Sequence, residues 1–348
     1  MSQAGGGWSP SGDAIRAARE RTKNYVTLTP LLRAEGLDQK GFRVWVKPEN
    51  LQRTGSFKVR GAFNAVAALN PETRTRGVVA FSSGNHAQAV ALAARELGMA
   101  ERGEAYPCTV VMPEGASSLK VERTKNLGAE VVFCGKTVKE RQMRAAELAH
   151  ESGRAVIPSY DHPEVISGQG TLGTEILDQW MGAPSRTRRL GLVAGPIGGG
   201  GLMAGTAAGL RARGFSNRII GVEPEAADDT RKSMEAGQRV EIPLPETVCD
   251  SLMSTTPGAL TFPVLQKCKV EVRTTSEAAI KNACVWLLNE LKLLVEPGGG
   301  VAVAAWLEGR IDPREGLDPA IAQEAVLDAV LILSGGNVEP SVVAGWTP

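Results

Sequence analysis

The stretch LGLVAGPIGGGGLMAG, residues 190–205, decides the fold class. Its first half is a short apolar run typical of a buried strand, and its end opens an apolar segment with helical spacing. Four consecutive glycines, Gly198 to Gly201, join the two halves. Glycines let successive backbone N–H groups approach an anion, and the following helix N-terminus adds a favourable dipole. The stretch therefore predicts a strand, an anion-binding turn and a helix.

The expected anion is a lone phosphate rather than a nucleotide. The turn lacks the Lys-Ser/Thr pair of a P-loop, and it lacks the GxGxxG spacing with a later acidic residue. A plain tight turn is the alternative, but four glycines cost conformational entropy that such a turn does not require. We therefore interpret Gly198, Gly199, Gly200 and Gly201 as a phosphate cradle.

Apolar runs alternate with helical patterns on both sides of this turn. We predict strands at 77–83, 109–113, 130–134, 190–196, 218–224 and 329–337. Helices are predicted at 86–99, 118–127, 138–152, 171–180, 202–212, 276–294 and 300–309. This alternation is typical of βα units on a parallel sheet. It predicts an α/β protein with two doubly wound parallel-sheet domains.

The expected domain organisation follows from the order of these units. A small domain covers 77–154, and a large domain combines 13–76 with 155–348. Residues 1–12 contain Gly5 to Gly7 and are expected to form a disordered tail. The last predicted strand ends shortly before Pro348, so we expect no C-terminal regulatory domain.

Composition restricts the class of partner. With 39 basic and 38 acidic residues the formal charge is +1, which gives no field to recruit nucleic acid or an anionic membrane. The one strongly apolar stretch, 191–210, contains Pro196 and the glycine turn, so it suits a strand and turn better than a membrane helix. Five cysteines without a CxxC pair, and a start without a signal peptide, indicate reduced thiols in the cytoplasm. We expect a small-molecule partner.

A lysine stands out in SFKVRG, residues 56–61, where Lys58 follows a Thr54-Gly55-Ser56 turn. A lysine at a helix start is usually a solvated surface residue. A lysine that forms an imine must instead have its pKa lowered by burial or by neighbouring cations. Arg53 and Arg60 supply positive charge nearby, which favours the second interpretation without deciding it.

Two polar turns follow predicted strands. SSGNHAQ, residues 82–88, offers hydroxyls, an amide and N–H groups that suit a carboxylate, although Ser83 or Asn85 as a simple N-cap is the alternative. SGGN, residues 334–337, ends the closing strand. Ligands of open α/β sheets gather at such strand ends.

Taken in order, six motifs resemble the fold type II pyridoxal-phosphate enzymes, and most closely the threonine/serine dehydratases and serine racemase. The motifs are PENLQRTGSFKVRGAFNA, SSGNHAQ, SGQGT, GGGGL, EP followed by DD, and SGGN. The resemblance runs from about Tyr25 to Asn337. It implies a tryptophan synthase β-like fold with pyridoxal 5'-phosphate between two domains, and a homodimer or homotetramer.

The resemblance also implies roles at the cofactor. Lys58 would hold pyridoxal phosphate as an imine, with Phe57 beside the ring and Asn85 bonded to the 3-oxygen. Backbone N–H groups of the four glycines and of Leu202 would bind the phosphate. Ser334 would face the pyridine nitrogen and leave it largely unprotonated, which favours prompt loss of a β-substituent over transamination.

The implied reaction is α,β-elimination from L-threonine, L-serine or a related 3-hydroxy amino acid. The freed Lys58 amine would remove the α-proton, and a 2-oxo acid and ammonia would be released. The residues implied to hold the substrate carboxylate are Ser82, Ser83, Gly84, Asn85 and His86. Ser83 matches the second acid–base group of serine racemase, so racemisation is an alternative. A non-catalytic module that retains the fold is a third.

Departures from the family pattern leave the substrate side chain open. Cys249-Asp250-Ser251 replaces the usual Ala-Asp-Gly, and Pro158-Ser159-Tyr160 replaces a frequent His-Pro. If Ser159 and Tyr160 line the pocket, 3-phenylserine or 3-hydroxyaspartate becomes an alternative substrate. Arg141 matches a position that reaches a second carboxylate in some relatives, although we interpret it as a solvated helix arginine.

The segment EPEAADD, residues 223–229, resembles the cation site of the same family. Glu223, Asp229 and the carbonyl of Ala227 would supply oxygen ligands, which suit Mg²⁺ or Ca²⁺. The alternative is that these acids cap the following helix at its positive end. We expect a structural cation.

Overall fold

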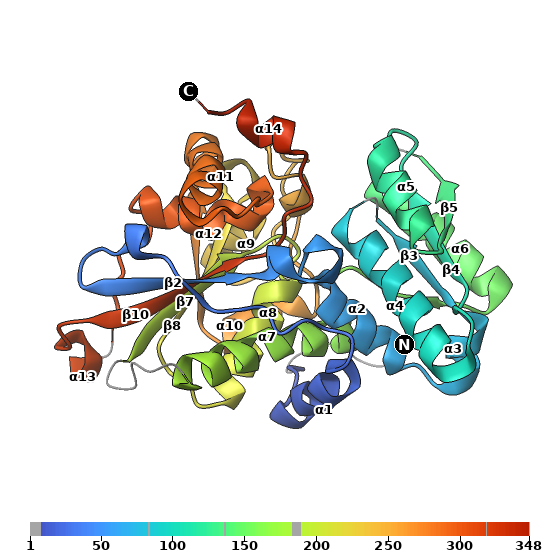
Figure 1. Cartoon of the computed structure of the whole chain (residues 1–348), viewed down its shortest axis with the longest axis horizontal. Helices are drawn as coiled ribbons and strands as arrows, with labels where there is room; N and C mark the ends of the chain where they lie inside the picture. Colours follow the sequence, from blue (N-terminus) through green and yellow to red (C-terminus); the bar gives the residue numbers. More distant parts are fainter. Residues whose placement is uncertain (1–7, 83, 136, 183–188, 318, 348) are drawn as a thin grey trace.

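The structure is a computed structural model that describes residues 8–82, 84–135, 137–182, 189–317 and 319–347. Two sheets organise it, and Figure 1 shows them in two bodies with α2 (Lys58–Ala67) lying between. The larger sheet has the order β1-β2-β10-β7-β8-β9. Its strands are β1 (Leu32–Arg33), β2 (Phe42–Pro48), β7 (Leu190–Pro196), β8 (Arg218–Pro224), β9 (Val270–Thr275) and β10 (Leu327–Leu333). All of its pairings are parallel except β1 with β2.

The smaller sheet is parallel throughout, with the order β5-β4-β3-β6. Its strands are β3 (Val78–Phe81), β4 (Cys108–Met112), β5 (Glu130–Phe133) and β6 (Ala155–Val156). The helices around it are α3 (Pro71–Arg76), α4 (Asn85–Arg102), α5 (Ser118–Asn126) and α6 (Val138–Ser152). The predicted α/β fold with two parallel sheets is confirmed.

Helices cover both faces of the larger sheet (Figure 1). On one side lie α11 (Glu277–Leu291) and α12 (Pro297–Leu307), and on the other α1 (Gly12–Thr22), α7 (Pro163–Gly182), α8 (Gly201–Ala212) and α10 (Thr261–Lys267). Successive side chains of β10 point to opposite faces of the sheet. Leu331 therefore packs in the core beneath α11 and α12, and Ile332 in the core beneath α7 and α8. The remaining helices are α9 (Asp229–Ala236), α13 (Pro319–Ala322) and α14 (Pro340–Ala344).

Helix α7 begins at Pro163, so the predicted start at residue 171 was wrong. The glycines that suggested a later start serve close packing between helices instead. A Cβ on Gly168 would lie 2.5 Å from the Arg60 carbonyl oxygen, and one on Gly205 would lie 2.7 Å from the Cβ of Gln169. The backbones of α2, α7 and α8 therefore approach one another closely at these glycines.

The strand order brings the predicted motifs together. β10 lies between β2 and β7 in the larger sheet and pairs with both in parallel, so the turns after all three strands open at the same edge. These turns lead to Lys58, Ser334 and the glycine turn. The candidate site therefore lies where sheets of this class bind ligands.

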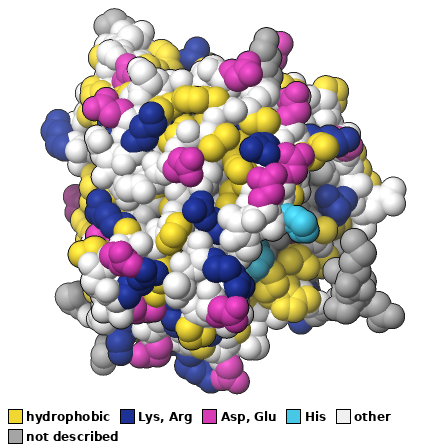
Figure 2. All heavy atoms as spheres, turned by 90° about the vertical axis from the view of Figure 1, so that its right-hand side faces the viewer, with side chains coloured by type: hydrophobic (Ala, Val, Ile, Leu, Met, Phe, Trp, Pro, Cys, Tyr) yellow, Lys and Arg dark blue, Asp and Glu magenta, His cyan; other side chains and the backbone are white. Residues whose placement is uncertain are grey.

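The surface carries no dominant sign of charge on the face drawn in Figure 2, where basic and acidic side chains are interspersed with apolar patches. Across the described ranges, no helix combines the length and apolar character needed to span a bilayer.

Candidate active site

Lys58 opens α2 with an enclosed amine. Its Nζ donates a hydrogen bond to the Ser159 carbonyl at 2.8 Å and lies 5.1 Å from the centroid of the Phe57 ring. The residue keeps some solvent exposure, but burial of the amine lowers its pKa to about 8, with the nearby Glu296 carboxylate acting in the opposite direction. An amine with this pKa is far more nucleophilic near neutral pH than an ordinary lysine.

The expectation that Arg53 and Arg60 assist Lys58 by their charge was wrong. Arg60 is buried and makes paired hydrogen bonds to the carboxylates of Glu49 and Glu175, at 2.7 to 3.0 Å. Arg53 pairs with Glu96 at 3.2 Å. Both positive charges are thus balanced by carboxylates, and burial is the main cause of the lowered pKa of Lys58.

Asn85 is the first residue of α4, and Gly84 occupies the N-cap position without a side-chain cap. The N-cap alternative is therefore wrong for Asn85. Its Nδ2 donates to Glu296 Oε1 at 2.7 Å, and its Oδ1 accepts from Asn337 Nδ2 at 2.7 Å. The uncapped start of α4 leaves backbone N–H groups for an anion. Ser83 lies outside the described residues, so its predicted roles stay predictions.

Two neighbours of Asn85 have defined positions. The His86 Nε2 lies 2.7 Å from the Ile157 carbonyl, and burial, aided by the Lys58 charge, lowers the His86 pKa to about 3. The imidazole is therefore neutral at physiological pH and donates to that carbonyl. Ser82 Oγ accepts from the Gly84 N–H at 3.3 Å. His86 consequently brings no positive charge toward a substrate carboxylate.

The glycine turn has the geometry of an anion cradle. Gly200 has φ +92°, a conformation that favours glycine, and a Cβ there would lie 2.7 Å from Thr261 Oγ1. Helix α8 starts at Gly201 without a side-chain cap, so the N–H groups of its first turn, including that of Leu202, remain available. A phosphate fits this combination.

Ser159 and Tyr160 lie between Lys58 and the glycine turn. The Ser159 carbonyl accepts the Lys58 hydrogen bond, and a Cβ on Gly199 would lie 2.5 Å from ring carbons of Tyr160. Burial raises the pKa of the Tyr160 hydroxyl, and Asp161 and Asp229 add to the shift. These two predicted pocket residues therefore adjoin both the reactive amine and the predicted phosphate position.

Ser334 follows β10 and is buried. Its carbonyl accepts the Phe57 N–H at 3.1 Å, which joins the end of this central strand to the residue before Lys58. The structure thus brings Lys58, Phe57, Asn85, Ser334 and the glycine turn to one region.

The predicted cation ligands lie at the end of β8. Both carboxylate oxygens of Glu223 accept backbone N–H groups from the first turn of α9, those of Thr230 and Arg231, at 3.0 and 2.9 Å. This matches the helix-capping alternative for Glu223. Both oxygens of Asp229 are buried without a hydrogen bond. Burial raises the pKa of Glu223 to about 8 and of Asp229 to about 7, with a neighbouring aspartate adding to each shift.

Among the described residues, no group of three or more His, Cys, Asp or Glu side chains is arranged to hold a metal ion. The predicted cation site has only two such side chains, Glu223 and Asp229. Its third ligand would be a backbone carbonyl, that of Ala227 at the end of the short 3-10 helix Glu225–Ala227. The buried, unpaired oxygens of Asp229 are the feature that fits a cation.

Glu296 and Asn337 form part of this region, and the sequence reasoning assigned neither a role. Glu296 precedes the proline that begins α12 and is 4% exposed, so it is a buried acid. The available signal was an acidic residue before Pro297 and three glycines, directly ahead of the helix predicted at 300–309. Asn337 is the last residue of the SGGN turn, for which the sequence predicted only a place at a strand end.

Two basic side chains of α5 contact residues of the larger body beside the site, and a third, Arg141, lies on α6. Lys120 Nζ bonds Asp250 Oδ2 at 2.7 Å, and Arg123 contacts Asn337 Oδ1 at 3.5 Å. Arg141, near the start of α6, is partly buried, and burial lowers its pKa while Cys134 and Glu140 oppose the shift. Its expected description as a solvated helix arginine therefore needs correction.

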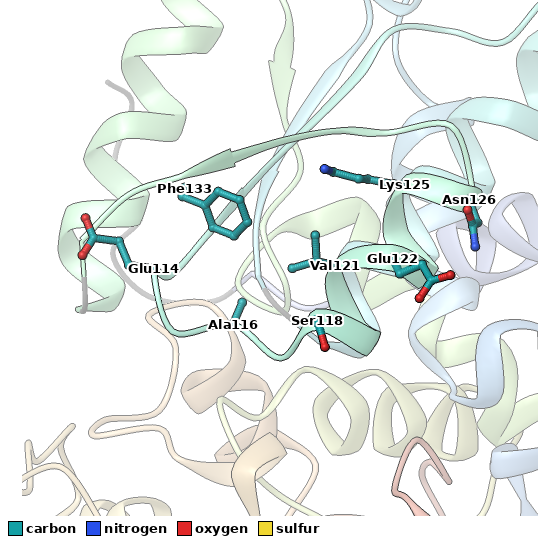
Figure 3. Close-up of a pocket in the computed structure, with 8 residues that line it drawn as sticks. All are labelled: Glu114, Ala116, Ser118, Val121, Glu122, Lys125, Asn126 and Phe133. Atoms are coloured by element: carbon teal, nitrogen blue, oxygen red, sulfur yellow. The ribbon is translucent and has the colours of Figure 1, made fainter.

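A separate surface pocket of about 550 Å³ lies on the smaller body beside α5 and β5. Figure 3 shows the Phe133 ring and the Val121 side chain on opposite sides of it, with Glu114 and Glu122 at its ends. None of the predicted site residues lines this pocket.

Comparison with known proteins gives concordant results. A family model described as pyridoxal-phosphate dependent enzyme matches residues 22–320. The chain is 41% identical to the L-threo-3-hydroxyaspartate ammonia-lyase of Pseudomonas sp, over 84% of this chain and 88% of that protein. It is 38% identical to the Saccharomyces cerevisiae protein of the same name, over 94% and 93%. The crystal structure of a threonine deaminase from T.th. is similar with a TM-score of 0.82 and 40% identity, covering 95% of this chain and 99% of that one.

Proposed function

This chain belongs to the pyridoxal-phosphate-dependent enzymes, among the ammonia-lyases, and from that premise we propose that its preferred substrate is L-threo-3-hydroxyaspartate. The main sequence-based prediction was threonine or serine, with 3-hydroxyaspartate as an alternative. The alternative has the better support, because the chain is 41% and 38% identical to hydroxyaspartate ammonia-lyases of a bacterium and a yeast. That pair of similarities carries the proposal.

The cofactor would be held by the residues that the resemblance implies. Lys58 would hold it covalently, the N–H groups of Gly198 to Leu202 would bind its phosphate, and Ser334 would face its ring nitrogen. Bound pyridoxal phosphate supplies an electron sink for negative charge at the substrate α-carbon. The enclosed Lys58 amine and the uncapped start of α8 support this assignment.

Proton transfer would be the task of Lys58. With a pKa of about 8, the free amine is neutral in a substantial fraction of molecules near neutral pH and can accept the substrate α-proton. The Ser159 carbonyl, 2.8 Å from Nζ, would orient it. The N–H groups at the start of α4 would hold the substrate α-carboxylate, because the helix N-terminus there has no side-chain cap.

Hydroxyaspartate differs from threonine by a second carboxylate where threonine has a methyl group. A partly enclosed cationic side chain would distinguish hydroxyaspartate from threonine, because a hydrogen bond to a charged group is worth about 1.5–3 kcal/mol. We assign this role to Arg141, whose guanidinium is partly buried and has a lowered pKa caused mainly by burial. A charge-assisted hydrogen bond to a substrate carboxylate would be stronger in such a partly desolvated position than in water.

The test is steady-state turnover of a substrate panel by the wild type and Arg141→Met. We expect kcat/KM to be highest for L-threo-3-hydroxyaspartate and to fall about 10- to 100-fold in Arg141→Met, with serine turnover nearly unchanged. Arg144→Met is the matched control, since Arg144 lies on the same helix and pairs with Glu147 at 3.0 Å. Equal or faster turnover of threonine or serine by the wild type would refute the proposed preference.

Threonine elimination is the second candidate function. The similarity to threonine deaminase, at 40% identity over nearly the whole chain, favours it. In the same panel, 2-oxobutanoate formation from L-threonine above the rate for hydroxyaspartate would select this candidate. Recovery of D-isomers and of solvent deuterium in unreacted substrate would instead indicate racemisation. The homodimer or homotetramer stays a prediction.

We also propose that Glu223, Asp229 and the Ala227 carbonyl bind Mg²⁺ or Ca²⁺. Oxygen ligands of this kind suit these hard cations. The buried carboxylate of Asp229, which has no hydrogen bond of its own, supports the assignment, while Asp228 pairs with Lys232 at 2.9 Å and is already satisfied.

A further inference from the structure

A buried carboxylate that the proposed reaction does not use lies next to the site. Glu296 stands at the N-cap of α12 and is 4% exposed. A Cβ on Gly335 would lie 2.5 Å from Glu296 Oε1, so only glycine leaves room for the acid beside the end of β10. The Glu296 N–H bonds the Gly335 carbonyl at 3.0 Å, which fixes its backbone. The carboxylate therefore has a defined position at the carboxyl end of the central strand.

The donors and acceptors of the hydrogen bonds around Glu296 can be assigned in only one way. The Thr54 carbonyl can only accept, so the group of Asn337 that faces it at 2.7 Å must be its NH₂. The same NH₂ donates to Asn85 Oδ1 at 2.7 Å. Asn85 therefore presents its own NH₂ to Glu296 Oε1, at 2.7 Å. One of the two N–H bonds of Asn85 is used there, and the second is left for another acceptor.

The contact also joins the two bodies of the molecule. Asn85 begins a helix that follows β3 of the smaller sheet, whereas Glu296 begins a helix that covers the larger sheet. Figure 1 shows α4 and α12 in different bodies. The Glu296 carboxylate thus sets the angle of an amide that comes from the opposite side of the site.

Charged and titratable groups surround Glu296 on several elements. Lys58 on α2 is close enough for the Glu296 charge to act on its amine. Asp250 and Lys120 act on Glu296 in opposite directions, and the Cys284 thiol on α11 also lies within its influence. Burial is the main cause that raises the Glu296 pKa to about 7, with Asp250 adding to it.

We propose that Glu296 is a positioning residue for the reaction: it holds the Asn85 amide so that the second N–H points to the cofactor 3-oxygen, and its charge stabilises a proton on the Lys58 nitrogen. The inference rests on the proposed attachment of the cofactor at Lys58. A carboxylate near a cationic nitrogen favours the protonated form of that nitrogen. The Lys58 nitrogen consequently stays protonated to a higher pH than it would beside a neutral amide.

The test is a pH titration of the visible absorbance of the cofactor in the holoenzyme, for the wild type and Glu296→Gln. The substitution keeps an oxygen for Asn85 and removes the negative charge. We expect the midpoint to fall by about one pH unit. Glu308→Gln is the matched control, because Glu308 lies at the other end of the same helix and bonds Thr275 and Ser276; its midpoint should equal that of the wild type.

An unchanged midpoint in Glu296→Gln, with the visible band present, would overturn the role of Glu296 while leaving the proposed function intact. A wild-type protein without any cofactor band would overturn the proposed function itself. If Glu296→Gln does not fold, Glu296→Asp takes its place. That variant keeps the charge and shortens the side chain, so we expect a wild-type midpoint with cofactor affinity reduced about tenfold. Wild-type affinity in Glu296→Asp would contradict the positioning role.

Discussion

Capture of the cofactor by the apoenzyme should depend on pH in a way that reports the Lys58 amine directly. The pKa of this amine is lowered from 10.5 to about 8, mainly by burial. Only the neutral amine attacks an aldehyde. At pH 7 the neutral fraction is about 300-fold larger than for an ordinary lysine, because each pKa unit is a factor of ten. The capture rate should therefore rise about tenfold per pH unit up to pH 8 and level off above it.

The assay is stopped-flow absorbance after mixing apoenzyme with pyridoxal phosphate across pH 6 to 10. The same series with a short lysine peptide corrects for titration of the free cofactor. The Glu296→Gln variant should level off at a lower pH, since Glu296 raises the Lys58 pKa. A corrected rate that keeps rising to pH 10 would show that Lys58 titrates like an exposed lysine, and the argument from burial would then fail.

Three further perturbations have defined outcomes. Arg60→Met leaves the buried Glu49 without its cationic partner, while Glu175 keeps Lys47, and should lower the free energy of unfolding in urea by about 3–5 kcal/mol; Arg76→Met, on an exposed pair, should change it by less than about 1 kcal/mol. Gly200→Ala should weaken cofactor binding in equilibrium dialysis, while Gly214→Ala, with a similar positive φ but open space around it, should leave binding intact. Added Mg²⁺ or Ca²⁺ should raise the thermal midpoint of the wild type but not of Asp229→Asn, and an equal shift in both would exclude this cation site.

The pattern of apolar residues in the sequence was sufficient to predict several buried strands of the parallel sheets. The predicted strands at 190–196 and 218–224 coincide with β7 and β8, because each is short and buried and has an apolar centre, LGLVAG in β7 and IIGV in β8. Strand β2 was not predicted, since FRVWVKP contains charged residues. One of them, Lys47, is fully buried and is neutralised by Glu175 at 2.5 Å. A contact between residues so far apart in sequence has no local signal.

The same limit applies to the candidate site. The glycine turn could be predicted because its backbone conformation and close contacts require glycine, and the glycines are visible in the sequence. The role of Glu296 could not, because it arises from a hydrogen bond to Asn85, 211 positions earlier. The supposed help from Arg60 was wrong for a related reason: Glu49 and Glu175 face it only in the folded chain. The resemblance to a family supplied roles that local patterns could not.

The glycine contacts between α7 and its neighbours restrict where this enzyme can change. A single added methyl group at Gly168, Gly173 or Gly205 would meet main-chain atoms of another helix, which have no room to yield. A mutant library made to select for new substrates should therefore leave these three glycines unchanged. Substitutions should be tolerated more readily on α5 and α6, which carry many exposed side chains.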